Sequence, residues 1–474
     1  MTSSLGTPPG TTVVDVAVIG AGVVGSAIAR LLSGHELDVA LLDARDDVGD
    51  GTSKANTAIL HTGFDASPGT LESRLVAEGY HLLRDYADRT GIPYEPTGAL
   101  LVAWDEEQLD ALPELQRKAE RNGYHETEIV GPGEVYAQVP ALGPGALGGL
   151  TVPGESIICT WTTTLALATD AVHRGTRLLR GHRVESVTVG GGDTVLHTSV
   201  GDVRARWVVN AAGLGGDVID ARFGHDRFHL HPRRGELFVY DKQARPLVDR
   251  IVLPVPSKLG KGVLISPTIY GNVMLGPTAE DMTDRRDTAT TESGYAFLLD
   301  KGRRIMPSLL REEVTATYAG LRAASDVGDY TIEVDAAQRY AVAGGIRSTG
   351  LTSSMAVAEY LVDLLGKAGL SLHERDDLPE PPRMPNIGEA RPRPYADAER
   401  IARDPAYGTV VCFCERVTRG EIRDALNSTI PPHDLDGLRR RTRAMNGRCQ
   451  GFYCGATVTG MLGDAPPHGE GQQR

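Results

Sequence analysis

The sequence predicts an α/β fold within a chain of about two or three domains. Its 474 residues exceed what a single hydrophobic core usually serves. Near the amino-terminal end, a short apolar run, a glycine-rich turn and a second apolar run predict a strand followed by a helix. Four of the five cysteines lie from residue 412 onward, which indicates a separate unit at the other end of the chain.

The composition is that of a globular protein, with 41% hydrophobic and 23% charged residues. A net charge of −13 argues against a nucleic-acid or anionic-membrane surface as the partner, because both attract cationic proteins. The first residues, MTSSLGTPPGTT, lack the charged and apolar regions of a secretory signal. Residues 13–32 are apolar but carry glycines, Asp15 and Arg30, so we expect no transmembrane segment. We therefore expect a cytoplasmic protein, in which clustered thiols indicate metal binding or redox chemistry.

The glycine-rich turn GAGVVG has the G-x-G-x-x-G spacing of a dinucleotide site, with Gly20, Gly22 and Gly25 at its glycine positions. These glycines permit a tight turn, close approach of a pyrophosphate, and close packing of helix on strand. We expect a strand over residues 14–19 and a helix over residues 23–32, whose positive end faces the phosphates. A second strand ends at Asp43, where a carboxylate can bind ribose hydroxyls. The motif does not separate FAD from NAD, and the alternative is a glycine-rich turn of another α/β fold.

Residues 51–71, GTSKANTAILHTGFDASPGTL, resemble the stretch after the second strand in the D-amino-acid-oxidase-like flavoenzymes. Within that superfamily they resemble the FAD-dependent glycerol-3-phosphate dehydrogenases and oxidases. Three later stretches resemble that family in the same order: RWVVNAAGLGGD, GKGVLISPTIYGNVMLGPTAED and GGIRSTGLTSSMAVAEYL. The resemblance extends over residues 13–365 and implies FAD as the cofactor.

The resemblance also implies the architecture, which is α/β plus α+β. A discontinuous Rossmann-like FAD domain would carry an inserted substrate domain with a mixed or antiparallel sheet and helices, the two together covering residues 13–370. Residues 105–124 have helical periodicity and would belong to the substrate domain. The expected FAD segments are about 13–80, 150–225 and 340–370, and the expected substrate segments are about 81–149 and 226–339.

In the resembled family, a hydride passes from an alcohol carbon to flavin N5 while a base takes the hydroxyl proton. His61 matches the position of that base, which needs a pKa near the working pH and hydrogen-bond reach of the hydroxyl. The alternatives are a packed loop histidine or a purely hydrogen-bonding role. Arg322, in YAGLRAAS, matches the arginine at the substrate, and its planar fork suits a phosphate or carboxylate. Lys261 and Arg347 are further candidates; for all three cations the alternative is a solvated surface charge.

The resemblance assigns further residues to the flavin. Gly350, Leu351 and Thr352 would form a turn whose N–H groups face the flavin pyrimidine edge. A helix beginning near Ser353 would add its positive end there, which stabilises the negative charge of the reduced flavin. The remaining cofactor-binding residues that we expect are Thr52, Ser53, Thr57, Val184 and Gly213.

The segment GESIICTWTTTLALATDAV departs from the family, which usually has a CP pair ahead of the helix. Here Cys159 is followed by Thr160 and Trp161. In relatives this segment lies near the substrate entrance, so the departure leaves the particular substrate open. Cys159 itself is expected to be a buried, small apolar residue.

The end of the chain divides into a linker and a compact unit. Residues 371–405 are rich in proline and predict a linker with one short helical piece, and residues 406–465 follow as a small domain. That domain carries a C-x-C pair and a C-x4-C pair, formed by Cys412, Cys414, Cys449 and Cys454. Structural zinc usually takes two C-x2–4-C knuckles, whereas a [2Fe–2S] cluster takes four thiolates, so the spacing favours iron–sulfur.

Two stretches, VCFCERVTRGEI and RRRTRAMNGRCQGFYCG, resemble the bacterioferritin-associated-ferredoxin-like [2Fe–2S] domain, a small helical module. In relatives it ends the large subunit of anaerobic glycerol-3-phosphate dehydrogenase. The resemblance implies that the four cysteines hold a [2Fe–2S] cluster. Nearby arginines would stabilise its negative charge, or else form a solvated helix face. They are Arg439, Arg440, Arg441 and Arg443.

We therefore expect an FAD-dependent dehydrogenase of a small anionic alcohol, first of all sn-glycerol 3-phosphate, with dihydroxyacetone phosphate as product. Electrons would pass through the cluster to an acceptor protein or quinone-linked partner, through which the chain could associate peripherally with a membrane. Alternative substrates are a 2-hydroxy acid, such as L-2-hydroxyglutarate, another polyol phosphate, or an amine or amino acid. A different class, a non-catalytic electron-transfer or redox-sensing subunit, would not require His61 or Arg322.

Overall fold

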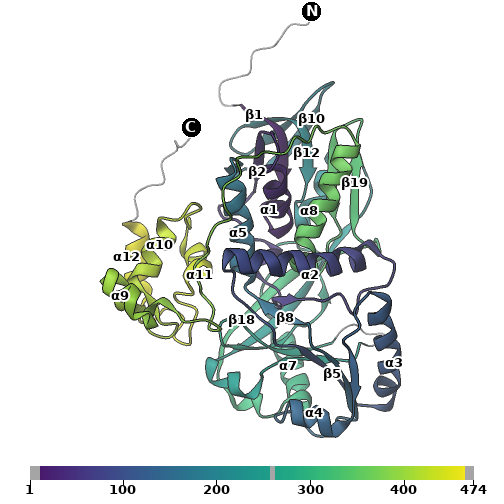
Figure 1. The fold of residues 1–474 in the computed structure, drawn as a ribbon, viewed down its shortest axis with the longest axis vertical. Helices are drawn as coiled ribbons and strands as arrows, with labels where there is room; N and C mark the ends of the chain where they lie inside the picture. The colour runs from purple at the N-terminus through teal and green to yellow at the C-terminus, as the bar shows by residue number, and fades with distance from the viewer. Residues whose placement is uncertain (1–10, 257–261, 465–474) are drawn as a thin grey trace, which may run out of the picture.

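The computed structural model describes residues 11–256 and 262–464, arranged as two sheet-containing domains with a small domain at their side (Figure 1). The chain enters through β1 (Thr12–Ile19), α1 (Val23–Leu32) and β2 (Val39–Leu42). These bounds confirm the strand, turn and helix predicted from the glycine spacing. No helix in the described ranges is both long and apolar enough to span a bilayer.

The first domain, here called the parallel-sheet domain, is built on an eight-stranded sheet. Its order is β10-β11-β12-β1-β2-β9, with β20 beside β12 and β19 beside β20. Strands β12, β1, β2, β9 and β20 run parallel, as expected of a Rossmann-like sheet. The bounds not yet given are β9 (Arg177–Leu179), β10 (Val184–Val189), β11 (Thr194–Thr198), β12 (Asp202–Asn210), β19 (Thr331–Asp335) and β20 (Tyr340–Gly344).

Helices α1, α5 (Thr160–His173) and α8 (Gly350–Lys367) pack together on this sheet, and α2 (Leu71–Thr90) crosses α8 (Figure 1). Their apolar faces form one core with strands β1 and β2. The crossing is close, because a Cβ at Gly79 of α2 would lie 2.4 Å from the Thr352 carbonyl oxygen. Glycine at that position therefore lets α2 lie directly across the beginning of α8.

The second domain, here called the mixed-sheet domain, contains a nine-stranded sheet in the order β17-β13-β16-β15-β14-β5-β7-β6, with β18 beside β13. Among the described strands of this sheet only β14 and β5 pair in parallel, so the expected mixed sheet is confirmed. Strands β15 and β16 pair as an antiparallel hairpin, and α3 (Glu106–Arg121) confirms the predicted helix. The remaining bounds are β5 (Ala99–Ala103), β6 (Glu128–Val130), β7 (Gly148–Val152), β13 (Leu230–Tyr240), β14 (Ile251–Pro254), β15 (Leu264–Pro267), β16 (Val273–Gly276), β17 (Glu280–Asp281), β18 (Val314–Ser325), α4 (Pro132–Gln138) and α7 (Glu292–Ile305).

The elements cross the expected segment boundaries at three places. Helix α2 continues past residue 80 to Thr90 and packs on α8, so its whole length lies with the parallel-sheet domain. Strand β7 ends at Val152 in the mixed sheet, and β19 lies in the parallel-sheet domain although residues up to 339 were expected in the other. Each boundary is set by sheet pairing and helix packing, which local sequence does not reveal.

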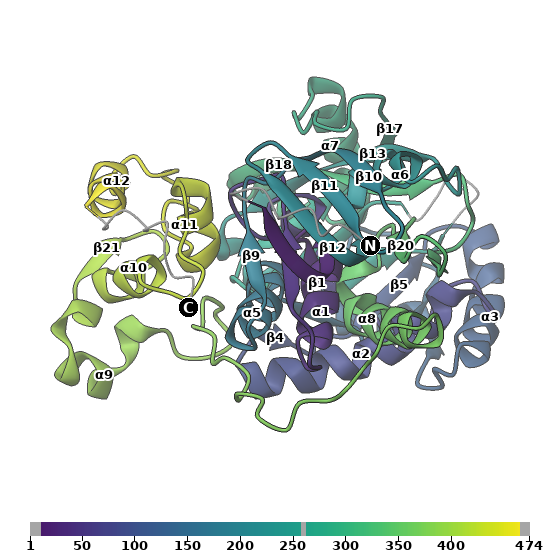
Figure 2. The same ribbon diagram turned by 90° about the horizontal axis from the view of Figure 1, so that it is seen from above.

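Residues 371–405, here called the strap, contain no long regular element, and α9 (Ala398–Arg403) is a short helix within them. The strap is nevertheless held on the two sheet domains by backbone hydrogen bonds. Met384 N donates to Thr90 O at 2.7 Å, and Glu389 N donates to Ile269 O at 2.9 Å. Figure 2 shows the strap running from the end of α8 along the body to α9. It therefore fixes where the small domain begins.

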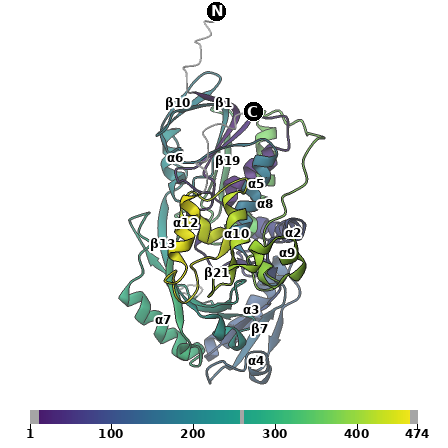
Figure 3. The ribbon, with the colours of Figure 1, turned by 90° about the vertical axis from the view of Figure 1, so that its left-hand side faces the viewer.

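The small domain, here called the cysteine domain (residues 406–464), is mostly helical. It contains β21 (Val410–Cys412), β22 (Val417–Thr418), α10 (Arg419–Leu426), α11 (Leu435–Thr442) and α12 (Gly455–Gly463). Thr418 and Glu421 form a capping box at the start of α10. The domain has its own apolar core, which includes Cys412 and Cys454. It lies against the side of the body, where the two sheet domains meet (Figure 3).

Of the four arginines in α11 and at its C-terminal end, Arg440 and Arg441 bind the parallel-sheet domain. Arg441 donates to both carboxylate oxygens of Asp47 at 2.7 Å, and Arg440 donates to Asp47 Oδ2 at 2.7 Å. The Arg441 and Asp47 side chains are only 4% and 5% exposed. A solvated basic face is therefore wrong for Arg440 and Arg441, whose charges neutralise a buried acid.

The ion pairs of Asp47 with Arg440 and Arg441 should make the interface between the cysteine domain and the parallel-sheet domain sensitive to acid. Burial acts to raise the pKa of Asp47, but hydrogen bonds and charges of Arg441 and Arg440 outweigh it and hold this pKa below its ordinary 3.8. The pair therefore stabilises the fold fully above about pH 4, and its contribution is lost as the pH falls further. Asp47→Asn is expected to lower the free energy of unfolding by about 3 kcal/mol at pH 7. It should also lose less stability than the parent on acidification to about pH 3.

Urea denaturation at both pH values measures the effect, and the exposed neighbour Asp46 supplies a matched Asp46→Asn control. Equal unfolding midpoints for the two variants would show that the Asp47 pair does not hold the domains together.

Candidate active site

The glycine turn leaves the first turn of α1 open to a ligand. Gly20 has φ +105°, and a Cβ there would lie 2.4 Å from Ala211 O. A Cβ at Gly25 would lie 1.8 Å from Gly20 O, so neither position accepts a side chain. Gly22 is the N-cap of α1 and offers no side-chain cap. Of the first N–H groups, that of Val23 donates to Ser53 Oγ at 3.0 Å, and the positive helix end faces outward, as an anion site requires.

Asp43 directly follows β2 and closes this turn. Its Oδ2 accepts from Ala21 N at 2.7 Å, and its Oδ1 accepts from Arg45 N at 2.8 Å. Burial raises the pKa of Asp43 above its ordinary value. Val184, at the start of β10, lies in the same apolar cluster as Leu42, the residue before Asp43. Asp43 therefore holds the glycine turn at the end of β2, and Val184 belongs to the core beneath the same sheet.

The 3₁₀ turn η1 (Thr52–Lys54) connects this turn to the mixed-sheet domain. Ser53 Oγ accepts from α1 as described, while Thr52 Oγ1 donates to Leu321 O of β18 at 3.0 Å. Thr57 lies in the loop that follows η1, and Gly213, with φ +55°, opens a short turn after β12. The structure thus brings Ser53 to the glycine turn and places Thr52 at the domain boundary.

Helix α8 begins at Gly350, three residues before the expected Ser353. Gly350, Leu351 and Thr352 are therefore its first turn rather than a turn ahead of it, and the expectation is wrong in that detail. Thr349 provides no side-chain cap, so the first N–H groups of α8 have no partner within the helix. A Cβ at Gly350 would lie 4.0 Å from Val24 Cγ2. The positive ends of α1 and α8 therefore lie next to each other.

His61 is held at the beginning of α8 by two contacts. Its backbone N–H donates to Thr352 Oγ1 at 3.0 Å, and its Nδ1 lies 2.9 Å from Glu155 Oε2. The imidazole is 19% exposed, whereas the Glu155 side chain is completely buried. His61 is thus a positioned histidine with one nitrogen inside the protein.

Glu155 is a site residue that the sequence did not reveal. Its Oε1 accepts from Thr62 N at 2.7 Å and from Thr62 Oγ1 at 2.9 Å, and its Oε2 faces His61. A carboxylate only accepts hydrogen bonds, so this network assigns the proton to His61 Nδ1 and leaves Nε2 with its lone pair. The two residues meet because β3 (Ile59–Leu60) pairs with β8 (Ser156–Ile158).

Arg322 lies on β18 opposite Arg233 of β13 and is partly buried. Within the described part of the chain its guanidinium donates one hydrogen bond, to Thr278 O at 2.8 Å. Burial, followed by the charge of Arg233, lowers the pKa of Arg322. The charge of Asp281, which pairs with Arg233 at 2.6 Å, acts in the opposite direction. A partly buried guanidinium with donors to spare is suited to an anion.

The other two predicted cations are Arg347 and Lys261. Arg347 pairs with Glu72 at 3.2 Å and donates to Gly328 O at 2.8 Å, so its charge is already neutralised. Lys261 lies outside the described residues. Cys159 is fully buried as expected, but it also caps α5, accepting from Thr162 N at 3.3 Å.

The four cysteines of the C-terminal domain gather in two neighbouring pairs, Cys412 with Cys454 and Cys414 with Cys449. Burial raises the pKa of Cys454 to about 12. The pKa of Cys449 is lowered, and the largest cause is a hydrogen bond from the backbone N–H of Tyr453. In the described ranges, no three acidic, histidine or cysteine side chains converge as a single metal ion would require. Two thiol pairs match a centre with two irons better than one tetrahedral zinc.

Comparison with known proteins agrees with this arrangement. Residues 15–364 match the family described as FAD dependent oxidoreductase. The chain belongs to this family. Residues 410–464 of the FAD-dependent oxidoreductase match a second family, described as BFD-like [2Fe-2S] binding domain. FAD and a [2Fe–2S] cluster are therefore its cofactors.

Three relatives of the FAD-dependent oxidoreductase are informative. Glycerol 3-phosphate dehydrogenase of Caloramator mitchellensis is 35% identical over 94% of this chain and 93% of its own length. One subunit of the anaerobic glycerol-3-phosphate dehydrogenase of Escherichia coli K12 is 28% identical over 94% of this chain and 88% of its own. The solved L-alpha-glycerophosphate oxidase of Mycoplasma pneumoniae with FAD bound has a TM-score of 0.75 at 27% identity. The match covers 79% of this chain and 100% of the oxidase chain.

The described residues fit FAD. The beginnings of α1 and α8, which carry no side-chain caps and lie next to each other, suit a pyrophosphate and an electron-rich ring edge. FAD supplies a two-electron acceptor when it is bound. This chain's own residues supply these helix ends and the positioned His61 beside α8.

Proposed function

We propose that this FAD-dependent oxidoreductase oxidises sn-glycerol 3-phosphate to dihydroxyacetone phosphate and passes the electrons on through its [2Fe–2S] cluster. The observation that carries the proposal is His61, held by Glu155 and Thr352 at the uncapped beginning of α8. The similarity to glycerol 3-phosphate dehydrogenase along nearly the whole chain supports the choice of substrate.

In this proposal His61 Nε2 takes the proton of the substrate hydroxyl as the hydride leaves the same carbon. Nδ1 keeps its proton toward Glu155, so the imidazolium that forms lies against a buried carboxylate. Thr62 holds the other oxygen of that carboxylate, which fixes the orientation of the imidazole. Buried second partners of this kind stabilise the charge that develops on a catalytic base.

Arg322 is the proposed anchor of the substrate phosphate. Its guanidinium has N–H donors beyond the one used by Thr278 O, and these suit a phosphate. Lys261 stays a second candidate for this role.

We also propose that electrons leave the cluster to a partner protein or a quinone-linked chain. Three aromatic side chains beside the cysteines are strongly exposed, namely Phe413 (73%), Phe452 (85%) and Tyr453 (77%). Exposed large apolar groups of this kind mark interaction sites more often than ordinary surface. The Escherichia coli relative, which is one subunit of its enzyme, supports a partner of this sort.

An anaerobic titration with polyol phosphates and hydroxy acids, read from bleaching of the flavin band, tests the substrate. We expect sn-glycerol 3-phosphate to bleach the flavin most efficiently. Arg322→Met is expected to raise the KM for this substrate by roughly 30-fold or more, because a charge-assisted phosphate contact is lost. Arg286→Met, at an arginine whose side chain is 89% exposed, is the matched control.

Faster bleaching by L-2-hydroxyglutarate than by any polyol phosphate would replace the proposed substrate with a hydroxy acid. An unchanged KM in Arg322→Met would remove Arg322 from the anion site.

A further inference from the structure

Arg443 occupies a backbone position that favours glycine. It is the C-cap of α11, with φ +72° in the left-handed region. Glycine adopts this conformation at helix ends without strain, whereas a side chain does not. A strained residue persists where its surroundings hold it, so the Arg443 side chain indicates a specific role.

Arg443 contacts an aromatic pair of the body. The carbon at the centre of its guanidinium lies 4.2 Å from the ring centre of Tyr270 and 5.6 Å from that of Trp161. The two rings stack at 5.0 Å with an angle of 26°. The guanidinium also donates to Asn272 Oδ1 at 3.2 Å. Arg443 is 6% exposed, so these contacts are buried.

On its other side Arg443 reaches the residue next to a predicted cluster ligand. Arg443 Nε donates to Glu415 Oε2 at 3.3 Å, and Glu415 directly follows Cys414 in the chain. Glu415 is 2% exposed and is also paired with Lys242 of the mixed-sheet domain at 3.2 Å. Lys242 also pairs with Glu389 at 2.7 Å, so Arg443 is needed to balance the buried carboxylate beside the Cys414 loop.

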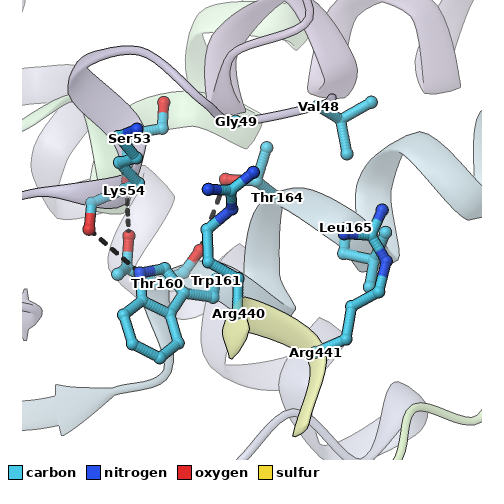
Figure 4. A pocket seen from close by; sticks show the side chains of 10 residues that line it. All are labelled: Val48, Gly49, Ser53, Lys54, Thr160, Trp161, Thr164, Leu165, Arg440 and Arg441. Carbon is cyan, nitrogen blue, oxygen red and sulfur yellow. Dashed lines mark hydrogen bonds between the residues drawn. The ribbon is translucent and has the colours of Figure 1, made fainter. Parts of the chain in front are cut away.

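The aromatic pair in turn contacts the η1 segment. Trp161 Nε1 donates to Lys54 O at 2.9 Å, and Thr160 Oγ1 donates to Ser53 O at 2.7 Å. Ser53 is the residue whose hydroxyl accepts from the first turn of α1. Figure 4 shows Trp161 and Thr160 beside Lys54 and Ser53, with the arginines of α11 on the other side of a small pocket. One continuous set of contacts therefore runs from the Cys414 loop to the glycine turn.

We infer that Arg443 is the positioning residue that sets the [2Fe–2S] centre against the flavin site and raises the reduction potential of the cluster. The rate of electron tunnelling falls steeply with distance, so the position of the cysteine domain on the body determines how fast the cluster is reduced. A cation near an iron–sulfur centre favours its reduced, more negative form. The inference rests on the proposed electron route. Oxidation of one alcohol releases two electrons and two protons; two equivalents of a one-electron acceptor take the electrons by way of the cluster, and solvent takes the protons.

The test uses the full-length holoenzyme and the variant Arg443→Gly, which retains the left-handed backbone and removes the side chain. Arg443→Lys restores the charge without the planar fork. Arg439→Met is the control, because Arg439 is on the same helix but bonds within the cysteine domain, to Asn446 and Asp436. The flavin is reduced anaerobically by light with EDTA, and cluster reduction is followed by absorbance and electron paramagnetic resonance. A redox titration gives the potential of the cluster.

Arg443→Gly is expected to slow cluster reduction about tenfold and to lower the cluster potential, with unchanged flavin and iron content. Arg443→Lys should recover most of the potential and less of the rate, and Arg439→Met should match the parent. Parent-like rate and potential in Arg443→Gly, or an equal loss in Arg439→Met, would overturn the inference. If the Arg443→Gly protein loses iron, the Trp161→Leu variant is tested by the same measurements of rate and potential. It removes an aromatic partner of Arg443 and keeps Arg443 itself.

Light-driven reduction needs no substrate. Failure of sn-glycerol 3-phosphate to bleach the flavin would therefore reject the proposed substrate and leave this test unaffected.

Discussion

Replacing His61 with asparagine is expected to lower kcat by about 10²- to 10⁴-fold, because the side chain loses the nitrogen that takes the hydroxyl proton. Asparagine can still donate to Glu155, so the loop and the bound FAD should be retained. Anaerobic stopped-flow bleaching of the flavin by sn-glycerol 3-phosphate measures the rate, and flavin released on denaturation measures the FAD content.

His81→Asn is the matched control, since His81 lies on the exposed face of α2. A His61→Asn protein that bleaches at the parent rate would assign His61 no part in the chemistry and would favour a non-catalytic electron-transfer role for the chain. A loss of rate that follows a loss of FAD would instead assign it to cofactor binding.

Glu155→Gln is expected to lower kcat by about 10²-fold or more while KM changes little. The glutamine amide can donate to His61 Nδ1, which favours the tautomer with its proton on Nε2 and removes the lone pair that the substrate hydroxyl requires. The negative charge beside the developing imidazolium is lost as well. Steady-state kinetics separates kcat from KM, and Glu155→Asp, which keeps the charge, should recover part of kcat.

Glu126→Gln provides the control on an exposed glutamate of the mixed-sheet domain. If Glu155→Gln changes KM alone, or leaves both constants at parent values, Glu155 acts on structure and not on the base.

The glycine turn could be predicted from the sequence because its physics is local. A side chain at Gly25 is excluded by Gly20 O of the same strand–turn–helix unit, whereas one at Gly20 is excluded by Ala211 O, which directly follows β12. His61 was likewise singled out from a contiguous stretch, and the four cysteines from their spacing, but that spacing did not predict that Cys412 lies beside Cys454 and Cys414 beside Cys449. The beginning of α8 was misplaced by three residues, because Thr349 carries no capping side-chain bond that would reveal it.

Glu155 could not be predicted, although the segment GESIIC was noted for another reason. Its contact with His61 depends on the register of β3 and β8, in which Leu60 faces Ser156. The partners of Arg440, Arg441 and Arg443 depend in the same way on the docking of the cysteine domain. A basic run along one helix predicts charge, but it does not predict which acid or ring receives it.

The order of residues along the chain determines the elements, the nucleotide turn and the set of thiols, because each arises from neighbours within one turn or one strand pair. The contact of His61 with Glu155, the bond of Arg322 to Thr278 O and the contact between Arg443 and the Trp161–Tyr270 pair were decided only by the tertiary structure. Sheet register, strap docking and desolvation bring these groups together from distant segments, and burial gives their charges a strength that they would not have in water.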